Sequence, residues 1–101
     1  MSAWATNHIT KLVAGETVSF RPRGNSMVPI IKSGELCTVE PVGDTELKVG
    51  QVVLCKVKGK HYLHLISGMK PDQVQISNNK GFVNGWTPRK NVFGVLAQVS
   101  K

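Results

Sequence analysis

The segment VVLCKVKGKHYLHLIS, residues 52–67, decides the expected fold. Two apolar runs, Val52–Val57 and His61–Ser67, are rich in residues that favour β-strands. They flank Lys58-Gly59-Lys60, a short connection whose glycine permits a tight turn. The segment therefore predicts a β-hairpin, and the rest of the chain is interpreted outward from it.

Shorter strand patterns, bounded by glycine and proline, lie on both sides of this hairpin. We expect these strands at residues 17–21, 36–40, 74–77 and 92–99. Turns between the later strands are indicated by Asn78-Asn79-Lys80-Gly81 and by Asn84-Gly85. Before the first strand, helical spacing predicts a short helix over residues 3–13, with the apolar face Ala5, Ile9, Leu12 and Val13. Gly15 would close it. The pattern as a whole predicts a small, mainly-β fold with six or seven short strands.

Composition fits one domain over residues 1–101. Hydrophobic residues make up 41% of the chain, which is enough for one small core. The apolar runs are too short to span a membrane. The N-terminal residues have neither the basic start nor the apolar core of a secretory signal. We therefore expect a soluble, cytoplasmic protein.

Cysteine and acidic residues restrict the chemistry. Cys37 and Cys55 form no CxxC motif and lie inside apolar strand patterns, which predicts buried, reduced thiols. The chain has only six aspartate and glutamate residues in total, so mechanisms that need clustered carboxylates have few candidates. The cysteines therefore indicate neither a zinc site nor a redox pair.

The net charge of +7 makes nucleic acid a candidate partner. Lys56, Lys58 and Lys60 are expected to alternate along one face of the hairpin, as Arg21 and Arg23 do on another strand. The sequence has no helix-turn-helix, zinc-finger or ribonucleoprotein signature, and it has few aromatic residues to stack on bases. A solvated basic face is the preferred interpretation, and nucleic-acid binding stays open as an alternative.

A candidate nucleophile, Ser26, lies in the segment Gly24-Asn25-Ser26-Met27-Val28-Pro29. Gly24 permits a sharp turn after a predicted strand, and Ser26 stands where the next segment begins. We expect that segment to be the first turn of a helix, where Pro29 is tolerated. Backbone N–H groups at such a position can stabilise an oxyanion. A serine that only caps the helix is the simpler interpretation of the same pattern.

The candidate base is His64, in the second strand of the hairpin. Strand alternation places its side chain on the face of Tyr62 and Ile66, opposite Leu63 and Leu65. A neutral imidazole near pH 7 is suited to activating a serine hydroxyl. A structural or surface histidine is the alternative.

In their order and spacing, these segments resemble the superfamily of signal peptidases and of the self-cleaving domains of LexA-type repressors. The family's Gly-x-Ser-Met-x-Pro motif corresponds to residues 24–29, and its following Gly-Asp corresponds to Gly34-Glu35. The family's segments Gly-Asp-Ile-Val, His-Arg-Ile/Val, Gly-Asp-Asn-Asn and Ile-Gly-x-Val correspond, in order, to Gly50-Gln51-Val52-Val53, His64-Leu65-Ile66, Ile76-Ser77-Asn78-Asn79 and Phe93-Gly94-Val95-Leu96. The match extends from about Ser19 to Val99. A histidine at the base position resembles the Ser–His branch, since bacterial signal peptidases and repressors have a lysine there.

The resemblance implies a fold of coiled antiparallel sheets and a serine peptidase that acts without metal or cofactor. Ser26 would be the nucleophile, with its own backbone N–H as an oxyanion donor, and His64 would be the general base. Met27 and Pro29 would contact the peptide or protein substrate.

The group that orients the histidine differs from the family pattern. The Ser–His branch has an aspartate shortly after its Asn-Asn pair, whereas residues 80–84 contain no acid. Asn84 is the nearest polar residue there, and it could orient His64 by a hydrogen bond, as asparagine does in some Cys–His peptidases. Bacterial signal peptidases also have a serine two positions before the nucleophile, where this chain has Gly24.

Two functions remain in view. The first is a soluble serine peptidase with a Ser26–His64 dyad, encoded by a bacterium or a phage. The second is a retired peptidase fold that serves as a binding or structural module, for example in a phage particle or in a repressor-like, homo-oligomeric assembly. The missing acid favours the second function, and the joint presence of the motif residues favours the first. Ala14-Gly15 resembles the bond that repressors cleave in themselves, but we interpret it as a turn from helix to strand.

Overall fold

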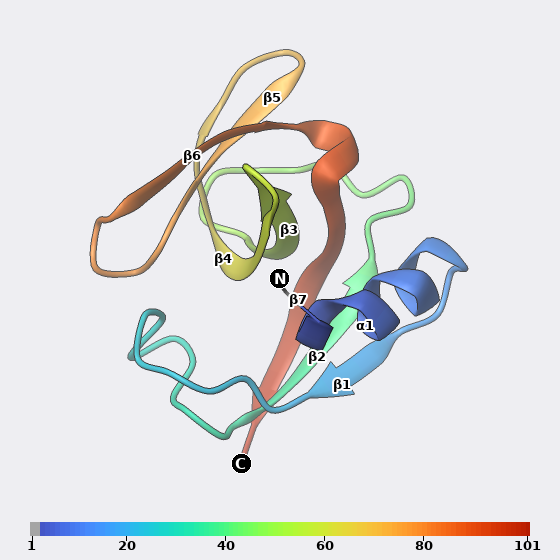
Figure 1. Ribbon diagram of the computed structural model, residues 1–101, viewed down its shortest axis with the longest axis vertical. Coiled ribbons are helices and arrows are strands. Elements are labelled where there is room, and N and C mark those ends of the chain that lie inside the picture. The colour runs from blue at the N-terminus through green and yellow to red at the C-terminus, as the bar shows by residue number, and fades with distance from the viewer. Residues whose placement is uncertain (1–2) are drawn as a thin grey trace.

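Seven antiparallel strands form one coiled sheet with an α-helix beside it (Figure 1). The computed structural model describes residues 3–101, so residues 1–2 of the segment compared with secretory signals lie outside it. The elements are α1 (Ala3–Val13), β1 (Val18–Phe20), β2 (Leu36–Pro41), β3 (Val52–Val57), β4 (Lys60–Met69), β5 (Gln73–Ser77), β6 (Val83–Pro88), the 3₁₀ turn η1 (Arg89–Asn91) and β7 (Val92–Ser100). The strand order is β1-β2-β7-β3-β4-β5-β6. The expected mainly-β architecture with a short N-terminal helix is confirmed.

Strand β3 lies between the two halves of the hydrophobic core. Val52 and Leu54 pack into a cluster with α1, β1 and β2, whereas Val53, Cys55 and Val57 pack into a second cluster with β5. Because both faces of the strand are covered, its sequence is an almost unbroken apolar run instead of an alternating one. The hairpin segment of the sequence thus supplies both clusters.

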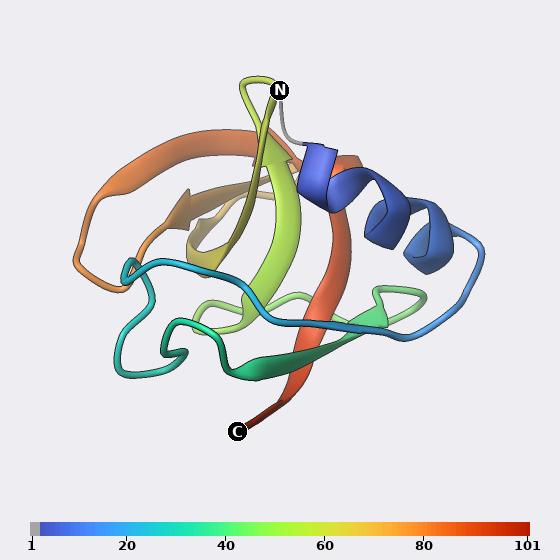
Figure 2. The ribbon, with the colours of Figure 1, turned by 60° about the horizontal axis from the view of Figure 1, so that its bottom comes forward.

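The sheet coils because its later strands return over β3. In β6, the Thr87 hydroxyl donates a 2.7 Å hydrogen bond to the carbonyl oxygen of Lys56 in β3. Strand β7 runs between β2 and β3, and its register shifts once against each of them, at Thr38/Val39 and at Leu54/Cys55. Such bulges increase the local bend of a strand. In Figure 2 the resulting sheet curves around its own interior, with α1 across one side.

Helix α1 covers the first cluster with the predicted apolar face, apart from one residue. Ala5 and Leu12 are buried and Ile9 packs against them, but Val13 is 74% exposed. The helix ends at Val13, and Gly15, whose φ is +90°, closes it as expected. There the N–H groups of Gly15 and Glu16 donate to the carbonyl oxygens of Leu12 and Lys11, the Schellman pattern. The Ala14-Gly15 turn from helix to strand is therefore confirmed.

The turn between β3 and β4 is shorter than expected, and this places Lys56 and Lys60 on opposite faces of the hairpin. Lys60 pairs with Val57, so the turn consists of Lys58 and Gly59 alone. Paired residues share a face of the sheet, so Lys60 lies on the face of Val57 while Lys56 lies on that of its partner His61. The prediction that Lys56, Lys58 and Lys60 line one face is wrong.

Asn84-Gly85, predicted as a turn, instead lies within β6. In the register of β5 and β6, Ile76 pairs with Gly85 and Ser77 pairs with Val83, so Asn84 is the extra residue of a β-bulge. Gly85 has φ +140°, which other residues rarely adopt. Asparagine and glycine favour turns and bulges for the same conformational reason, and the sequence pattern did not separate the two.

Both cysteines are buried, reduced thiols, as predicted. Burial raises the pKa of the Cys55 thiol to about 12. Burial, followed by the nearby Glu35 carboxylate, raises the pKa of Cys37. Neither thiol is activated as a nucleophile.

None of the helices within residues 3–101 has the length and apolar character needed to cross a membrane.

Candidate active site

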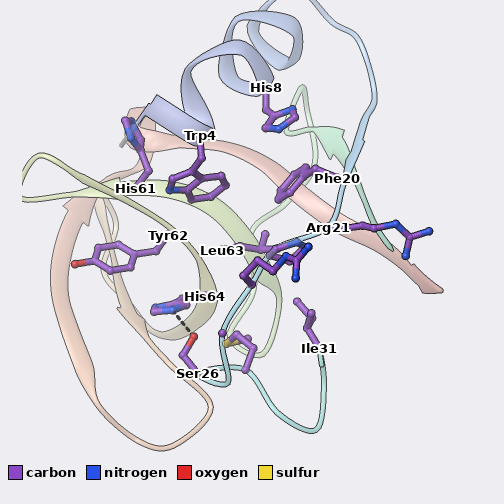
Figure 3. A pocket seen from close by; sticks show the side chains of 14 residues that line it. Trp4, His8, Phe20, Arg21, Ser26, Ile31, His61, Tyr62, Leu63 and His64 are labelled. Atoms are coloured by element: carbon purple, nitrogen blue, oxygen red, sulfur yellow. Dashed lines mark hydrogen bonds between the residues drawn. The ribbon is translucent and has the colours of Figure 1, made fainter. Parts of the chain in front are cut away.

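Ser26, His64 and Asn84 form a continuous chain of side-chain hydrogen bonds. Ser26 Oγ lies 3.2 Å from His64 Nε2, and His64 Nδ1 lies 2.7 Å from Asn84 Oδ1. The three residues come from separate parts of the sequence: the loop after β1, the middle of β4 and the bulge of β6. Figure 3 shows the serine hydroxyl directed at the imidazole. The structure therefore brings together all three residues that the sequence singled out for the reaction.

The amide oxygen of Asn84 determines which nitrogen of His64 carries the proton. Oδ1 can only accept a hydrogen bond, so Nδ1 of the imidazole must be the donor. In the neutral ring, Nε2 then has a free lone pair and accepts the hydrogen bond from the Ser26 hydroxyl. This is the tautomer that a general base needs in order to remove the serine proton.

The bulge in β6 directs Asn84 toward His64. A regular strand would alternate its side chains without interruption, but the extra residue changes the direction in which Asn84 points. Gly85 lies close to the β3–β4 turn: a Cβ at this position would lie 3.3 Å from the side-chain atoms Val57 Cγ1 and Lys58 Cε. The aim of Asn84 thus depends on a glycine at position 85.

The loop that carries Ser26 is a series of turns, not the start of a helix. Gly24 has φ +115°, and its N–H donates a hydrogen bond to Ser33 Oγ at 3.1 Å. The N–H of Ile31 donates to the carbonyl oxygen of Met27, but no helix follows. The expectation that Ser26 begins a helix, and with it the helix-capping interpretation, is therefore wrong, because local turn bonds and buried Met27 determine the loop path instead.

Asn79, which lies in the turn between β5 and β6, holds this loop in place. Its backbone N–H donates to the carbonyl oxygen of Ser26, and its side-chain Nδ2 donates to that of Val28, both at 2.9 Å. The turn belongs to the same hairpin as Asn84. One hairpin therefore positions both the serine loop and the partner of the histidine. Asn79 is part of the segment Ile76-Ser77-Asn78-Asn79 that resembles the family motif, but the residue type alone did not indicate these two hydrogen bonds.

His64 lies in a mostly apolar environment. Its side chain is only 9% exposed, and the ring of Tyr62 lies 4.9 Å away between centroids. Burial lowers the pKa of His64 because it disfavours the imidazolium, while the hydrogen bond to Asn84 acts in the opposite direction. Tyr62 and Ile66 pack with one core cluster and Leu63 and Leu65 with the other, as the alternation of β4 predicted. The ring is therefore neutral at pH 7, the state in which it can act as a base.

The backbone carbonyl and the backbone N–H of Ser26 differ in their hydrogen bonding. Its carbonyl oxygen accepts the hydrogen bond from Asn79. Within residues 3–101, its N–H donates to no other group of the protein. This N–H is the one that the sequence suggested as an oxyanion donor, and it lies beside the hydroxyl that would attack. A backbone donor of this kind stabilises negative charge as it develops on a carbonyl oxygen.

A cleft of about 420 Å³ opens onto the dyad. Ser26 and His64 lie at one end of it, and Trp4, His8 and Phe20 lie toward the other (Figure 3). Its remaining lining residues are Arg21, Pro22, Arg23, Gly24, Met27, Ile31, His61, Tyr62 and Leu63. Of the two residues expected to contact substrate, Met27 lines the cleft, while Pro29 is exposed and lies outside the described lining. The aromatic end was not predicted from the sequence, since helix α1 and β1 come together there only in the folded chain.

No family model matches the chain, and no curated protein matches it. Among residues 3–101, no group of three or more histidine, cysteine or acidic side chains is arranged to hold a metal ion.

We expect the pKa of His64 to lie below its ordinary value of about 6.5, because burial disfavours the charged ring. Asn84→Asp should raise this pKa, since a carboxylate beside Nδ1 stabilises the imidazolium. Titration of the His64 ring protons by NMR measures both values. Asn7→Asp, at an exposed position on α1, is the control and should leave the His64 midpoint unchanged. An equal midpoint in wild type and Asn84→Asp would contradict the contact with Asn84.

Gly85→Ala should disturb the tautomer of His64. The positive φ strains any residue with a Cβ, and the Cβ would also press on the Val57 side chain, at a cost of about 1–3 kcal/mol in unfolding free energy. Gly81→Ala is the matched control, because Gly81 also has positive φ (+89°) but has open space around it. Both variants should lose stability in urea, and only Gly85→Ala should change the ¹⁵N shifts of the His64 ring. Unchanged shifts in Gly85→Ala would show that the bulge does not aim Asn84.

Proposed function

We propose that this protein is a serine peptidase in which Ser26 attacks a peptide carbonyl and His64 acts as the general base. The observation that carries the proposal is the hydrogen-bonded series Ser26–His64–Asn84, at 3.2 and 2.7 Å. The motif resemblance to the Ser–His branch of the signal peptidase and LexA-type superfamily supports the same assignment. A cleft large enough for part of a peptide adjoins the serine hydroxyl.

The proposed reaction begins with transfer of the Ser26 hydroxyl proton to His64 Nε2. The serine oxygen forms a bond to the carbonyl carbon of the substrate, and the carbonyl electron pair moves onto its oxygen. The Ser26 N–H donates a hydrogen bond to that oxyanion. His64 then gives its proton to the leaving amine as the C–N bond breaks, which leaves an acyl-enzyme. In the second half, His64 takes a proton from water as the water oxygen bonds to the acyl carbon, and it returns that proton to Ser26 Oγ as the ester bond breaks, which releases the acid and restores the serine.

Asn84 limits this chemistry compared with an aspartate. It orients the ring and selects the tautomer, but its neutral amide adds no negative charge to stabilise the imidazolium that forms during the reaction. The same residue is the observation that favours the second candidate function, a retired peptidase fold that binds a protein without cleaving it. We favour the enzyme because burial, orientation and the serine contact all support a working base.

Covalent labelling of Ser26 tests the proposal directly. The wild-type protein should react with a fluorophosphonate probe, and mass spectrometry of the digest should locate the adduct on Ser26. Ser26→Ala and His64→Ala should each reduce labelling by several orders of magnitude, since nucleophile and base act as a unit. Ser67→Ala, on an exposed position of β4, is the control and should label like wild type.

A folded wild-type protein that neither labels nor cleaves a peptide library would contradict the enzyme and favour the binding module. Circular dichroism shows whether each variant is folded. Labelling that persists in Ser26→Ala would also contradict the assignment of the nucleophile.

Asn79 is expected to act as a positioning residue for Ser26. Asn79→Asp keeps the shape but removes the Nδ2 donor to Val28, so the serine loop should shift and labelling should slow by about tenfold to a hundredfold. Asn78→Asp is the isosteric control. Oδ1 of Asn78 accepts from the N–H groups of Lys80 and Phe82, and a carboxylate oxygen retains both bonds.

If Asn79 had a purely structural role, Asn79→Asp would lower thermal stability without specifically slowing the labelling of Ser26. The ¹⁵N shift of His64 Nδ1 should still show a protonated nitrogen in Asn79→Asp, because Asn84 and not the loop contacts that side of the ring. Equal labelling rates in the two variants would contradict the positioning role.

A further inference from the structure

The cleft has a distinctive composition beyond the Ser26–His64 dyad. Its far end is formed by Trp4 and His8 of α1 and by Phe20 of β1. The His8 ring stacks on Phe20 with centroids 4.4 Å apart, and the Trp4 ring is tilted against Phe20 at 5.7 Å. Trp4 nevertheless remains 45% exposed. A large aromatic side chain left open in a cleft is typical of a binding surface.

The charged side chains that line the cleft are positive. Arg21 and Arg23 belong to the lining, and the described lining residues include no aspartate or glutamate. Arg21 Nη1 donates a 2.9 Å hydrogen bond to the carbonyl oxygen of Gly34. A guanidinium has five N–H donors, so this bond fixes the group and leaves others for a ligand. Figure 3 shows the Arg21 side chain directed away from Ser26 and His64.

His8 contributes no charge to this end of the cleft at neutral pH. Its pKa is lowered by burial and by the positive charge of Lys11. The ring therefore acts as part of the aromatic wall, and the arginines supply the charge.

We propose that the cleft selects acidic peptides, with a substrate carboxylate bound by Arg21 and Arg23 away from the scissile bond and with the adjoining apolar part of the peptide against Trp4 and Phe20. This inference rests on the proposed peptidase function and adds the substrate class. Charge complementarity carries it: the chain has a net charge of +7, and a carboxylate entering the cleft meets two arginines and no competing acid.

A single-stranded nucleic acid also combines negative charge with stacking groups, but the surface fits it less well. Such ligands need a continuous basic track along the backbone. Lys56 and Lys60 lie on opposite faces of the hairpin, so they do not extend the arginine pair into a track. The cleft also ends at a serine and a buried histidine, which suit a peptide carbonyl.

Direct binding to the inactive Ser26→Ala chain tests this inference without requiring turnover. The probes are fluorescein-labelled ten-residue peptides of one apolar sequence that carry two glutamates, two glutamines or two lysines. By anisotropy at low salt, we expect the glutamate peptide to bind at least about tenfold more tightly than the glutamine peptide, and the lysine peptide to bind most weakly. The preference should weaken as salt is raised.

The arginines are tested by the double variant Arg21→Gln/Arg23→Gln, which should reduce the glutamate preference to less than about threefold. Lys48→Gln/Lys90→Gln removes the same charge from exposed sites outside the cleft lining and should retain the preference. If both double variants lose it equally, or if glutamate and glutamine peptides bind alike, the inference is wrong. Displacement of the glutamate peptide by a ten-residue oligothymidylate at lower concentration than by unlabelled peptide would also overturn it, in favour of a nucleic-acid site.

Trp4 provides a second, label-free measurement in the otherwise unchanged chain. Trp86 lies on β6 with the Lys70 ammonium over its ring, outside the cleft lining, so Trp86→Phe leaves Trp4 as the only tryptophan. Its emission should change on adding the glutamate peptide and not on adding the lysine peptide. Failure of fluorophosphonate labelling together with a retained glutamate preference would disprove the peptidase alone. Labelling without a preference would disprove the acidic substrate alone.

Discussion

The burial of β3 on both faces is the constraint on which the rest of the structure depends. One face packs against α1, β1 and β2, and the other packs against β5, so the sheet must coil to cover both. The coil brings β6 back over β3, where the Thr87 hydroxyl bonds to Lys56. Asn84 lies in β6, the edge strand beside β5, and this return brings it next to His64 in β4. The candidate site is thus a product of the closure of the sheet.

The β5–β6 hairpin couples the two halves of the candidate site. Its turn holds the Ser26 loop through Asn79, and its bulge holds His64 through Asn84. Serine and histidine are therefore positioned by one rigid unit, although they are 38 residues apart in the chain. Preorganisation of this kind lowers the cost of aligning groups at the moment of reaction.

The sequence was sufficient for what depends on local pattern. Alternation located β4 and the face of His64 correctly, and helical spacing located α1, although Val13 proved exposed because the apolar face is narrower than the run of apolar residues. The sequence was insufficient where one residue pattern is compatible with two local structures. Asn84-Gly85 satisfies a turn and a bulge equally, and pairing with Ile76 and Ser77 decides between them. The aromatic end of the cleft joins Trp4 and His8 of α1 to Phe20 of β1, and their meeting depends on how α1 packs against β1, which no local periodicity specifies.

The burial of both native thiols determines how the protein can be labelled for spectroscopy. Burial raises the pKa of Cys55 to about 12 and also raises the pKa of Cys37, so few thiolates exist at neutral pH, and both side chains are buried. Maleimide chemistry depends on exposed thiolate. A single cysteine introduced at an exposed position, such as Lys80 in the β5–β6 turn, would therefore be modified ahead of the native pair. A spectroscopic label can therefore be attached beside the serine loop without first replacing Cys37 and Cys55.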